Sequence, residues 1–233
     1  ADDIVGGDGA NTISGGSDGI YVYEVYYGST ANIDANTISD WDDAGIYIDY
    51  LYEGFFCTIS NNTMTADAAG AYYGIYTYEI YEGGVLNVVN NTATGYGNTA
   101  GDEAGFWNDD YITDGSDLNM TGNTFTAHSA GSQYGIYLDD GFDYGCNSTI
   151  ASNTVTGVLG DCLYSYYCED GSFVTIANNT FTAIAAGCDN GLYFDDGVDY
   201  GSRLTVTGNT VTGAQDCGLW IYEVDDGSTV NIT

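Results

Sequence analysis

The segment FVTIANNTFTAIAAGCDNGLYFDDGVDYGSRLTVTGNTVTG, residues 173–213, contains one full repeat and the start of the next. It opens with FVTIANNTFT (173–182), passes through GLYFDDG (191–197) and returns as RLTVTGNTVT (203–212). Apolar residues alternate with polar ones in these runs, which is typical of β-strands with one buried face. Gly, Asp and Asn between the runs favour turns. One repeat therefore predicts three short strands.

Two motifs of this segment recur along the whole chain. The tetrad Asn-Thr-apolar-Thr/Ser occurs eight times, at spacings of 25 to 32 residues. Its asparagines are Asn11, Asn36, Asn62, Asn91, Asn123, Asn153, Asn179 and Asn209. A Gly or Cys followed by a large apolar and an aromatic residue also occurs eight times, interleaved with the tetrads. A repeat of this length without helical patterning indicates a solenoid, and we expect the stacked asparagines to form a hydrogen-bonded structural ladder at one corner.

These repeats predict an all-β fold, a right-handed parallel β-helix (solenoid) of about eight coils with three short strands each. Irregular coil lengths favour the right-handed form, because a left-handed hexapeptide helix would keep a stricter period. An antiparallel sandwich is the competing fold, but the in-phase recurrence of two motifs disfavours it. We expect residues 1–233 to form a single β-helix domain that is open at both ends.

Three runs carry a family resemblance: GIYxxD, DGSTVxI and NNTxTG. They resemble the right-handed parallel β-helix repeats of the pectate-lyase-like superfamily, and most closely the acidic repeats of large microbial surface proteins. The resemblance spans the whole chain. It implies the fold, but the superfamily includes lyases, hydrolases, epimerases, adhesins and structural shafts, so it does not select a function.

The charge of the chain limits its partners. There are 34 acidic residues against a single Arg and no Lys, for a formal net charge of −33. This excludes nucleic acid, whose phosphates require basic side chains, and no apolar run is long enough for membrane insertion. Self-repulsion of this size requires divalent cations, high salt or low pH. The near absence of Lys and Arg removes trypsin-type cleavage sites, which suits an extracellular or cell-surface location.

The residue two positions after the motif Gly or Cys is always aromatic, and the alternation predicts that it points outward. These residues are Tyr21, Tyr47, Tyr76, Trp107, Tyr137, Tyr164, Tyr193 and Trp220. Stacked rings of this kind stabilise a sheet through contacts between neighbouring strands. A long aromatic surface also serves as a contact with other copies of the chain or with the rings of a polysaccharide. Both uses, assembly and glycan contact, stay open.

Carboxylates accompany the aromatic residues, and two neighbouring pairs stand out: Asp139 with Asp140, and Asp195 with Asp196. Paired carboxylates can act on a glycosidic bond. The resemblance, however, implies an Arg-x-Lys pair and a His for hydrolases and a basic residue for lyases, and this chain offers only His128 and Arg203. We therefore expect no catalytic residues and no enzymatic activity.

The same four aspartates are candidate metal ligands, because carboxylate oxygens suit Ca²⁺ and Mg²⁺. The segment GGDGANTIS (6–14) approaches a calcium-binding nonapeptide, but Asn11 stands where Asp is usual and the pattern occurs once. The sequence fixes no cofactor. It leaves open a diffuse binding of Ca²⁺ or Mg²⁺ along the acidic surface.

Six cysteines lack the spacing of a zinc site. Cys162, Cys188 and Cys217 each precede the first strand of a coil, and neighbouring coils lie at a distance that suits a disulfide. Cys162–Cys188 is the first pairing expected and Cys188–Cys217 the second.

The ends of the chain suggest self-association. No amphipathic helix is predicted to cap either end, and the last coil lacks the third strand that the first residues supply. We expect an extracellular structural β-solenoid, a filament subunit or a shaft segment of a cell-surface protein, that stacks head-to-tail on copies of itself. The alternative is a β-helix that binds or cleaves polysaccharide, an adhesin or a pectate-lyase-like protein.

Overall fold

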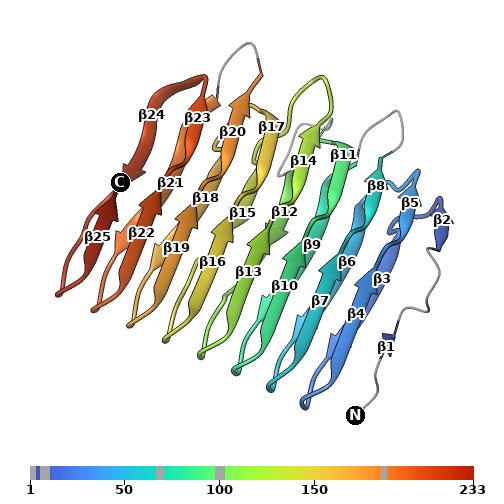
Figure 1. The fold of residues 1–233 in the computed structure, drawn as a ribbon, viewed down its shortest axis with the longest axis horizontal. Helices are drawn as coiled ribbons and strands as arrows, with labels where there is room; N and C mark the ends of the chain where they lie inside the picture. Colours follow the sequence, from blue (N-terminus) through green and yellow to red (C-terminus); the bar gives the residue numbers. More distant parts are fainter. Residues whose placement is uncertain (1–3, 6–10, 67–70, 98–102, 185–187) are drawn as a thin grey trace.

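The structure is a computed structural model that describes residues 4–5, 11–66, 71–97, 103–184 and 188–233. Every regular element in these residues is a β-strand, and the strands form three sheets in which each strand pairs in parallel with its counterparts in the neighbouring coils (Figure 1). The predicted parallel β-solenoid is thereby confirmed. The described residues contain no helix of the length and apolar character needed to cross a bilayer.

Sheet C carries the Gly-apolar-aromatic motif and begins each coil. Its eight described strands are β3 (Ile20–Val25), β6 (Ala44–Leu51), β9 (Tyr73–Ile80), β12 (Ala104–Asn108), β15 (Ile136–Leu138), β18 (Leu163–Cys168), β21 (Cys188–Val198) and β24 (Ala214–Ile221). The apolar residue after the motif Gly points inward in each strand. Ile46 pairs with Ile75 in the next coil, and both are fully buried.

Sheet A follows sheet C in each coil. Its nine described strands are β1 (Ile4–Val5), β4 (Thr30–Asp34), β7 (Phe56–Ser60), β10 (Val85–Val89), β13 (Asp117–Thr121), β16 (Asn147–Ala151), β19 (Phe173–Ala177), β22 (Arg203–Thr207) and β25 (Thr229–Ile232). The turn from sheet C to sheet A places a residue and the Gly that follows it at positive φ, as at Asp170 (48°) and Gly171 (78°). Two successive positive φ angles reverse the chain in a two-residue turn, which is why Gly recurs there.

Sheet B contains the second to fourth residues of the Asn-Thr-apolar-Thr/Ser tetrads. Its eight described strands are β2 (Thr12–Ser14), β5 (Thr37–Ser39), β8 (Thr63–Thr65), β11 (Thr92–Tyr96), β14 (Thr124–Ala127), β17 (Thr154–Val158), β20 (Thr180–Ala183) and β23 (Thr210–Thr212). The apolar third residue is buried, as at Phe125 and Val155. The inward residues of the three sheets together form one continuous core along the solenoid axis.

The tetrad asparagines lie at the corner between sheets A and B and form a continuous ladder. Asn123 Nδ2 donates to Asn153 Oδ1 at 2.9 Å and to the carbonyl of Val88 at 2.8 Å. The backbone N–H of Asn123 also donates to Asn153 Oδ1, at 3.0 Å. The same pattern links the ladder from Asn11 to Asn209. It satisfies buried backbone groups at a corner where the sheet hydrogen bonds are interrupted.

The motif glycines at the start of sheet C allow the coils to approach closely. A Cβ atom on Gly74 would lie 2.6 Å from the carbonyl oxygen of Gly105 in the next coil and 2.8 Å from the Ala93 Cβ. No real Cβ tolerates such contacts, so this position requires Gly. At Gly218, in the last coil, a Cβ would meet no atom within 4 Å.

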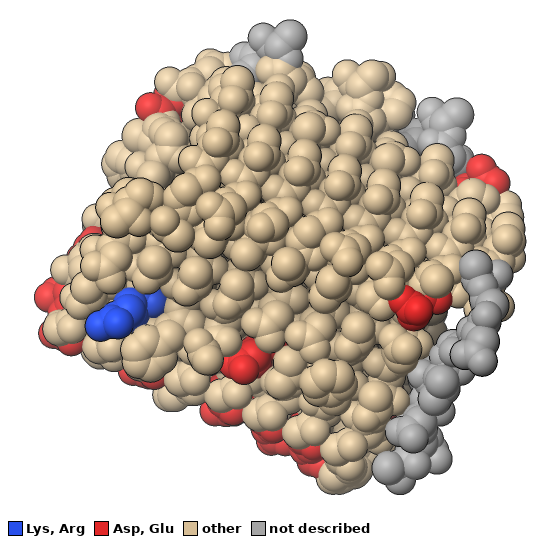
Figure 2. All heavy atoms as spheres, viewed as in Figure 1, with Lys and Arg blue, Asp and Glu red and all other residues tan. Residues whose placement is uncertain are grey.

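The connection from sheet B to sheet C takes up most of the variation in coil length. It spans eight residues from Thr12 to Ile20 but fourteen from Thr92 to Phe106. The other two corners keep nearly constant lengths. Acidic side chains gather along the lower edge of the molecule in Figure 2, where the chain turns from sheet C to sheet A, and the strands above that edge carry few.

Candidate functional site

The outward face of sheet C carries a column of stacked aromatic rings, here called the aromatic ladder. It consists of Tyr21, Tyr47, Tyr76, Trp107, Tyr137, Tyr164, Tyr193 and Trp220. Among the ladder neighbours whose rings contact each other directly, Trp107 and Tyr137 have the closest centroids, at 3.9 Å, and Tyr193 and Trp220 the most distant, at 6.4 Å. Tyr76 and Trp107 are linked through Tyr73, which contacts both rings. The ladder therefore consists of two sets of rings, Tyr21 to Tyr76 and Trp107 to Trp220, which Tyr73 joins through tilted contacts.

The middle of the aromatic ladder is not accessible to a large ligand. Tyr76 is 7% exposed and Trp107 is 4% exposed, although both point away from the core. Tyr73, the first residue of β9, and Tyr134, from a connection between sheets B and C, pack against them. Only the ends are open, with Tyr21 52% and Trp220 42% exposed. The rings point away from the solenoid core, but neighbouring side chains cover the middle of the ladder.

Carboxylates accept hydrogen bonds from the polar atoms of the ladder. Tyr137 donates to Asp139 at 2.6 Å, Tyr193 to Asp195 at 2.7 Å, and the indole N–H of Trp107 to Asp109 at 2.9 Å. The hydrogen bond to Asp195, together with burial, raises the pKa of Tyr193 to about 12. A carboxylate that accepts from a phenol stabilises the neutral phenol. These contacts fix the orientation of the rings.

The four aspartates predicted as metal ligands lie in separate coils. Asp139 and Asp140 directly follow β15, whereas Asp195 and Asp196 belong to β21 two coils further along. Burial, a hydrogen bond with Asp110 and the charges of neighbouring aspartates raise the pKa of Asp140 to about 6. Within the part of the chain that the structure describes, no three His, Cys, Asp or Glu side chains are grouped as metal ligands. Metal binding by these residues stays a prediction.

The calcium-like segment 6–14 is only partly visible, because residues 6–10 lie outside the described residues. Its Asn11 belongs to the asparagine ladder, with Nδ2 donating to Asn36 Oδ1 at 2.9 Å. His128 lies in a turn, where Nδ1 accepts from the backbone N–H of Ala130. Arg203 is exposed at the start of β22. His128 and Arg203 lie on different sheets or connections from the aspartate pairs.

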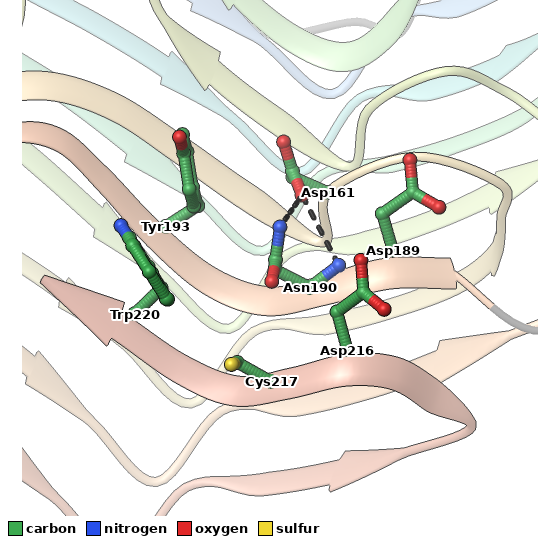
Figure 3. A pocket seen from close by; sticks show the side chains of 7 residues that line it. All are labelled: Asp161, Asp189, Asn190, Tyr193, Asp216, Cys217 and Trp220. Atoms are coloured by element: carbon green, nitrogen blue, oxygen red, sulfur yellow. Dashed lines mark hydrogen bonds between the residues drawn. The ribbon is translucent and has the colours of Figure 1, made fainter.

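A recess of about 490 Å³ lies at the last coils, beside the open end of the aromatic ladder (Figure 3). Its lining residues are Asp161, Asp189, Asn190, Tyr193, Asp216, Cys217 and Trp220. Figure 3 shows the two rings on one side and the three carboxylates on the other, with Asn190 between them. The Asn190 side chain donates to Asp161 at 2.8 Å, and its backbone N–H does so at 3.1 Å. Burial nevertheless raises the pKa of Asp161.

Sequence reasoning missed these three aspartates. Asp161 lies in a connection between sheets B and C, whereas Asp189 and Asp216 lie near the start of β21 and β24, before the motif Gly. A signal was present, because each is adjacent to a cysteine: Asp161 precedes Cys162, Asp189 follows Cys188 and Asp216 precedes Cys217. A second recess, of about 400 Å³, lies at the turns from sheet C to sheet A. There burial and the nearby Asp143 charge raise the pKa of Glu169 to about 7.

Two of the cysteines lie close together in the core. The Sγ atoms of Cys162 and Cys188 are 3.4 Å apart, and both side chains are buried. Burial raises the pKa of both thiols. Cys217 instead lines the outer recess. The geometry places the first predicted pair within reach of a disulfide after a small movement.

Comparison with known proteins identifies the fold family. A family model described as a right-handed β-helix region matches residues 110–232, which is more than half of the chain. No curated protein and no solved structure matches the chain at a significant level. The matched segment contains coils with all three sheets and both recurrent motifs. The three parallel sheets and the family match together show that the chain belongs to the right-handed β-helix family.

Proposed function

We propose that the chain is an extracellular structural β-solenoid, a filament subunit or a shaft segment of a cell-surface protein, that stacks head-to-tail. The observation that carries the proposal is the open face of the last coil. Leu219 and Val230 are partly exposed and Ile232 is 61% exposed, whereas their counterparts in the inner coils are buried. Leu219 and Ile232 border an apolar hollow of about 320 Å³. Exposed apolar surface of this kind favours cover by another coil.

The two ends of the described solenoid present opposite edges of the same three parallel sheets. Sheet A has nine described strands whereas sheets B and C have eight, so a repeat of eight coils requires β25 of one copy to occupy the place of the two-residue β1 of the next. Strands β25, β23 and β24 form one set of edges, and β1, β2 and β3 form the opposite set. A parallel strand edge presents unpaired backbone groups that a like strand can satisfy. The cover that we propose is a coil of the same pattern, from a second copy or from the next coil of a longer chain. Repetition of this contact gives an open-ended polymer.

The extracellular location and the lack of catalytic activity are part of the proposal. Arg203 is the only basic residue besides His128, so there is almost no cleavage site for trypsin-like proteases. We propose that Ca²⁺ or Mg²⁺ offsets the acidic surface along the turns between sheets C and A. Diffuse counterions reduce the self-repulsion that would oppose stacking.

Gly218 provides the test. In the inner coils, the carbonyl oxygen of the next motif Gly lies close to the Cα of Gly45 and of Gly74, where it leaves no room for a Cβ. A coil stacked in register on the last coil would bring the same carbonyl oxygen against Gly218, so the methyl group of Gly218→Ala would clash with it. We expect the Gly218→Ala protein to fold and melt like the wild type but to lose stacking. Gly74→Ala, the matched control, should destabilise the fold itself. The readout is electron microscopy, with and without chelator, of fibres with an axial repeat of about 38 Å for eight coils.

Short rods of the wild type under all conditions would contradict stacking. So would fibres of Gly218→Ala that are as abundant as those of the wild type. Loss of fibres in chelator would show that divalent cations are needed to offset the negative charge during stacking.

The second candidate function is polysaccharide binding or cleavage at the recess of Figure 3. Tyr193 and Trp220 offer faces for sugar rings, and Asp189 and Asp216 offer hydroxyl acceptors. Binding assays with acidic and neutral polysaccharides, together with a lyase assay with and without calcium, test this candidate. Product formation, or binding that Trp220→Ala abolishes, would favour it over the structural role.

A further inference from the structure

The outward face of sheet B carries two straight columns of hydroxyl side chains. One column contains Thr12, Thr37, Thr63, Thr92, Thr124, Thr154, Thr180 and Thr210. The other contains Ser14, Ser39, Thr65, Thr94, Thr126, Thr156, Thr182 and Thr212. The register pairs each residue with its counterpart in the next coil. All sixteen side chains are exposed or half-buried, and we call this surface the threonine face.

The threonine face is a regular two-dimensional array. Neighbouring coils lie about 4.8 Å apart, and residues two apart on one strand lie about 6.7 Å apart. Figure 2 shows ordered rows of neutral side chains over the strands of sheet B. None of the 34 acidic residues of the chain stands at any of the sixteen positions. A surface without charge does not hold the strongly oriented hydration shells of ions.

Strand propensity alone does not account for this uniformity. Sheet A has the same spacing and the same parallel pairing, but its first outward column is mixed. That column contains Thr30, Phe56, Val85, Asp117, Asn147, Phe173, Arg203 and Thr229. Many residue types therefore fit this outward position, whereas the next outward column of sheet A, from Asn32 to Asn231, contains only Thr and Asn. Thr or Ser at sixteen of sixteen positions on sheet B points to a requirement beyond folding.

The threonine side chains are suited to a rigid contact. Thr is branched at Cβ and restricted at χ1, so little side-chain entropy is lost when the array meets a surface. Each Thr presents a methyl group and a hydroxyl that can donate and accept. Hydrogen bonds within the described residues engage few of these hydroxyls: Ser14 and Ser39 donate to Asp40, and the Thr94 hydroxyl lies 3.4 Å from both the Thr65 hydroxyl and the Met64 carbonyl oxygen. Most hydroxyls are left for an external partner.

We propose that the threonine face binds ice. The repeats along and across the strands lie close to the repeats of water oxygens on the prism faces of hexagonal ice. Hydroxyls that lie in such a lattice can replace surface waters in its hydrogen bonds, while the methyl groups occupy the spaces between them. A regular and rigid array of neutral side chains, with the Asp40 carboxylate beside its first two coils, fits an ordered water surface better than it fits a flexible polymer. Adsorption on ice would slow crystal growth, and stacked copies would lengthen the array.

The test is thermal hysteresis with ice-crystal morphology, and recovery of the protein in a slowly grown ice fraction. The wild type is expected to lower the freezing temperature of an ice crystal below its melting temperature, which is the hysteresis gap. It should also produce faceted crystals and be enriched in the ice fraction. Thr124→Tyr places a ring above the centre of the threonine face and should lose most of the gap. Tyr has a high strand propensity, so the fold should persist. Thr149→Tyr, at an outward position of sheet A, is the matched control and should keep the gap.

Absence of hysteresis and of enrichment in ice for the folded wild type would overturn the proposal. Equal loss of activity in Thr124→Tyr and Thr149→Tyr would overturn the assignment to sheet B. Adsorption of the wild type to crystalline cellulose or chitin without any effect on ice would assign the face to a solid polysaccharide instead. Should Thr124→Tyr fail to fold by circular dichroism, Thr156→Tyr takes its place, with the same expected loss.

Discussion

The rings of Trp107 and Tyr137 stack with their centroids 3.9 Å apart and their planes at 20°, although both lie outside the solenoid core. Trp107 also contacts Tyr73 and Tyr134, which cover it until only 4% of its surface is exposed. The aromatic ladder thus forms a second hydrophobic layer outside sheet C.

Trp107→Ala should therefore behave like a core truncation. We expect a loss of about 3 to 5 kcal/mol in the free energy of unfolding, measured by urea denaturation, because a buried ring is replaced by a cavity. Trp220→Ala removes a ladder ring that is 42% exposed and has Tyr193 as its stacked neighbour. It should cost about 1 kcal/mol. Equal losses for the two variants would show that burial by Tyr73 and Tyr134 contributes little.

The asparagine ladder gives a second test of stability. Asn123→Ala removes the oxygen that accepts from the backbone N–H and the side chain of Asn91, at 2.9 and 3.0 Å. These buried donors lose their partner, so we expect a cost of about 2 to 4 kcal/mol. Asn147→Ala, at an exposed side chain of sheet A, is the control and should leave the urea midpoint nearly unchanged. A midpoint of Asn123→Ala close to that of the control would contradict the structural role of the ladder.

Stability should fall as the pH rises from about 4 to 7. Burial first, then the hydrogen bond with Asp110 and neighbouring charges raise the pKa of Asp140 from 3.8 to about 6 in the folded chain. Burial and Asp143 raise that of Glu169 from 4.5 to about 7. The folded state therefore holds protons that the unfolded chain has released. Its stability decreases as the pH passes from the unfolded to the folded pKa values.

Asp140→Asn removes the free-energy cost of ionising Asp140 in the folded state. We expect a higher urea midpoint than the wild type at pH 8 and a weaker dependence on pH between about 4 and 7. Asp189→Asn, at an exposed carboxylate, is the control for the loss of one charge. Addition of Ca²⁺ at pH 8 should also raise the midpoint of the wild type. A wild type that is more stable at pH 8 than at pH 5 would refute the sign of this prediction.

Cys162 and Cys188 should form a disulfide under oxidising conditions. Two thiols lose two protons and two electrons to oxidised glutathione, which leaves as two reduced molecules. Because burial raises both thiol pKa values, the reaction should be slow at neutral pH. The bond closes a loop of 26 residues (162 to 188) and should add about 3 kcal/mol of stability.

Peptide mapping of oxidised protein, alkylated after unfolding, identifies the pair. Cys57, buried in another sheet, should remain a free thiol and serves as the internal control. Recovery of a Cys188–Cys217 peptide would support the second pairing instead. Cys188→Ala should abolish the stabilisation by oxidised glutathione.

The strands could be predicted because each lies in a repeat with a period of two, so the direction of every side chain follows from its position. Ile46, Phe125 and Asn123 all lie where the repeats predict. The cover of the aromatic ladder could not be predicted. Tyr73 and Tyr134 come from or next to connections of unequal length, where no periodicity indicates which way a side chain points.

The candidate sites were likewise predictable where they lie in the periodic strands and not where they lie beside the connections. The outward column of sheet C was predictable, but the recess at Asp161, Asp189 and Asp216 depends on how three connections fold beside one another. The threonine face lay within the tetrads that define the fold. The sequence alone did not predict that this face binds a ligand, because that inference depends on the exposure of the sixteen side chains in the structure.

The confinement of length variation to the connection from sheet B to sheet C has an evolutionary consequence. An insertion there does not change which residues stack, so new sequence can enter one edge while the other two corners keep the coils in phase. This edge borders both the threonine face and the aromatic ladder. Peptides grafted into it would be displayed at intervals along the axis, and whole coils could be duplicated or deleted without a new fold.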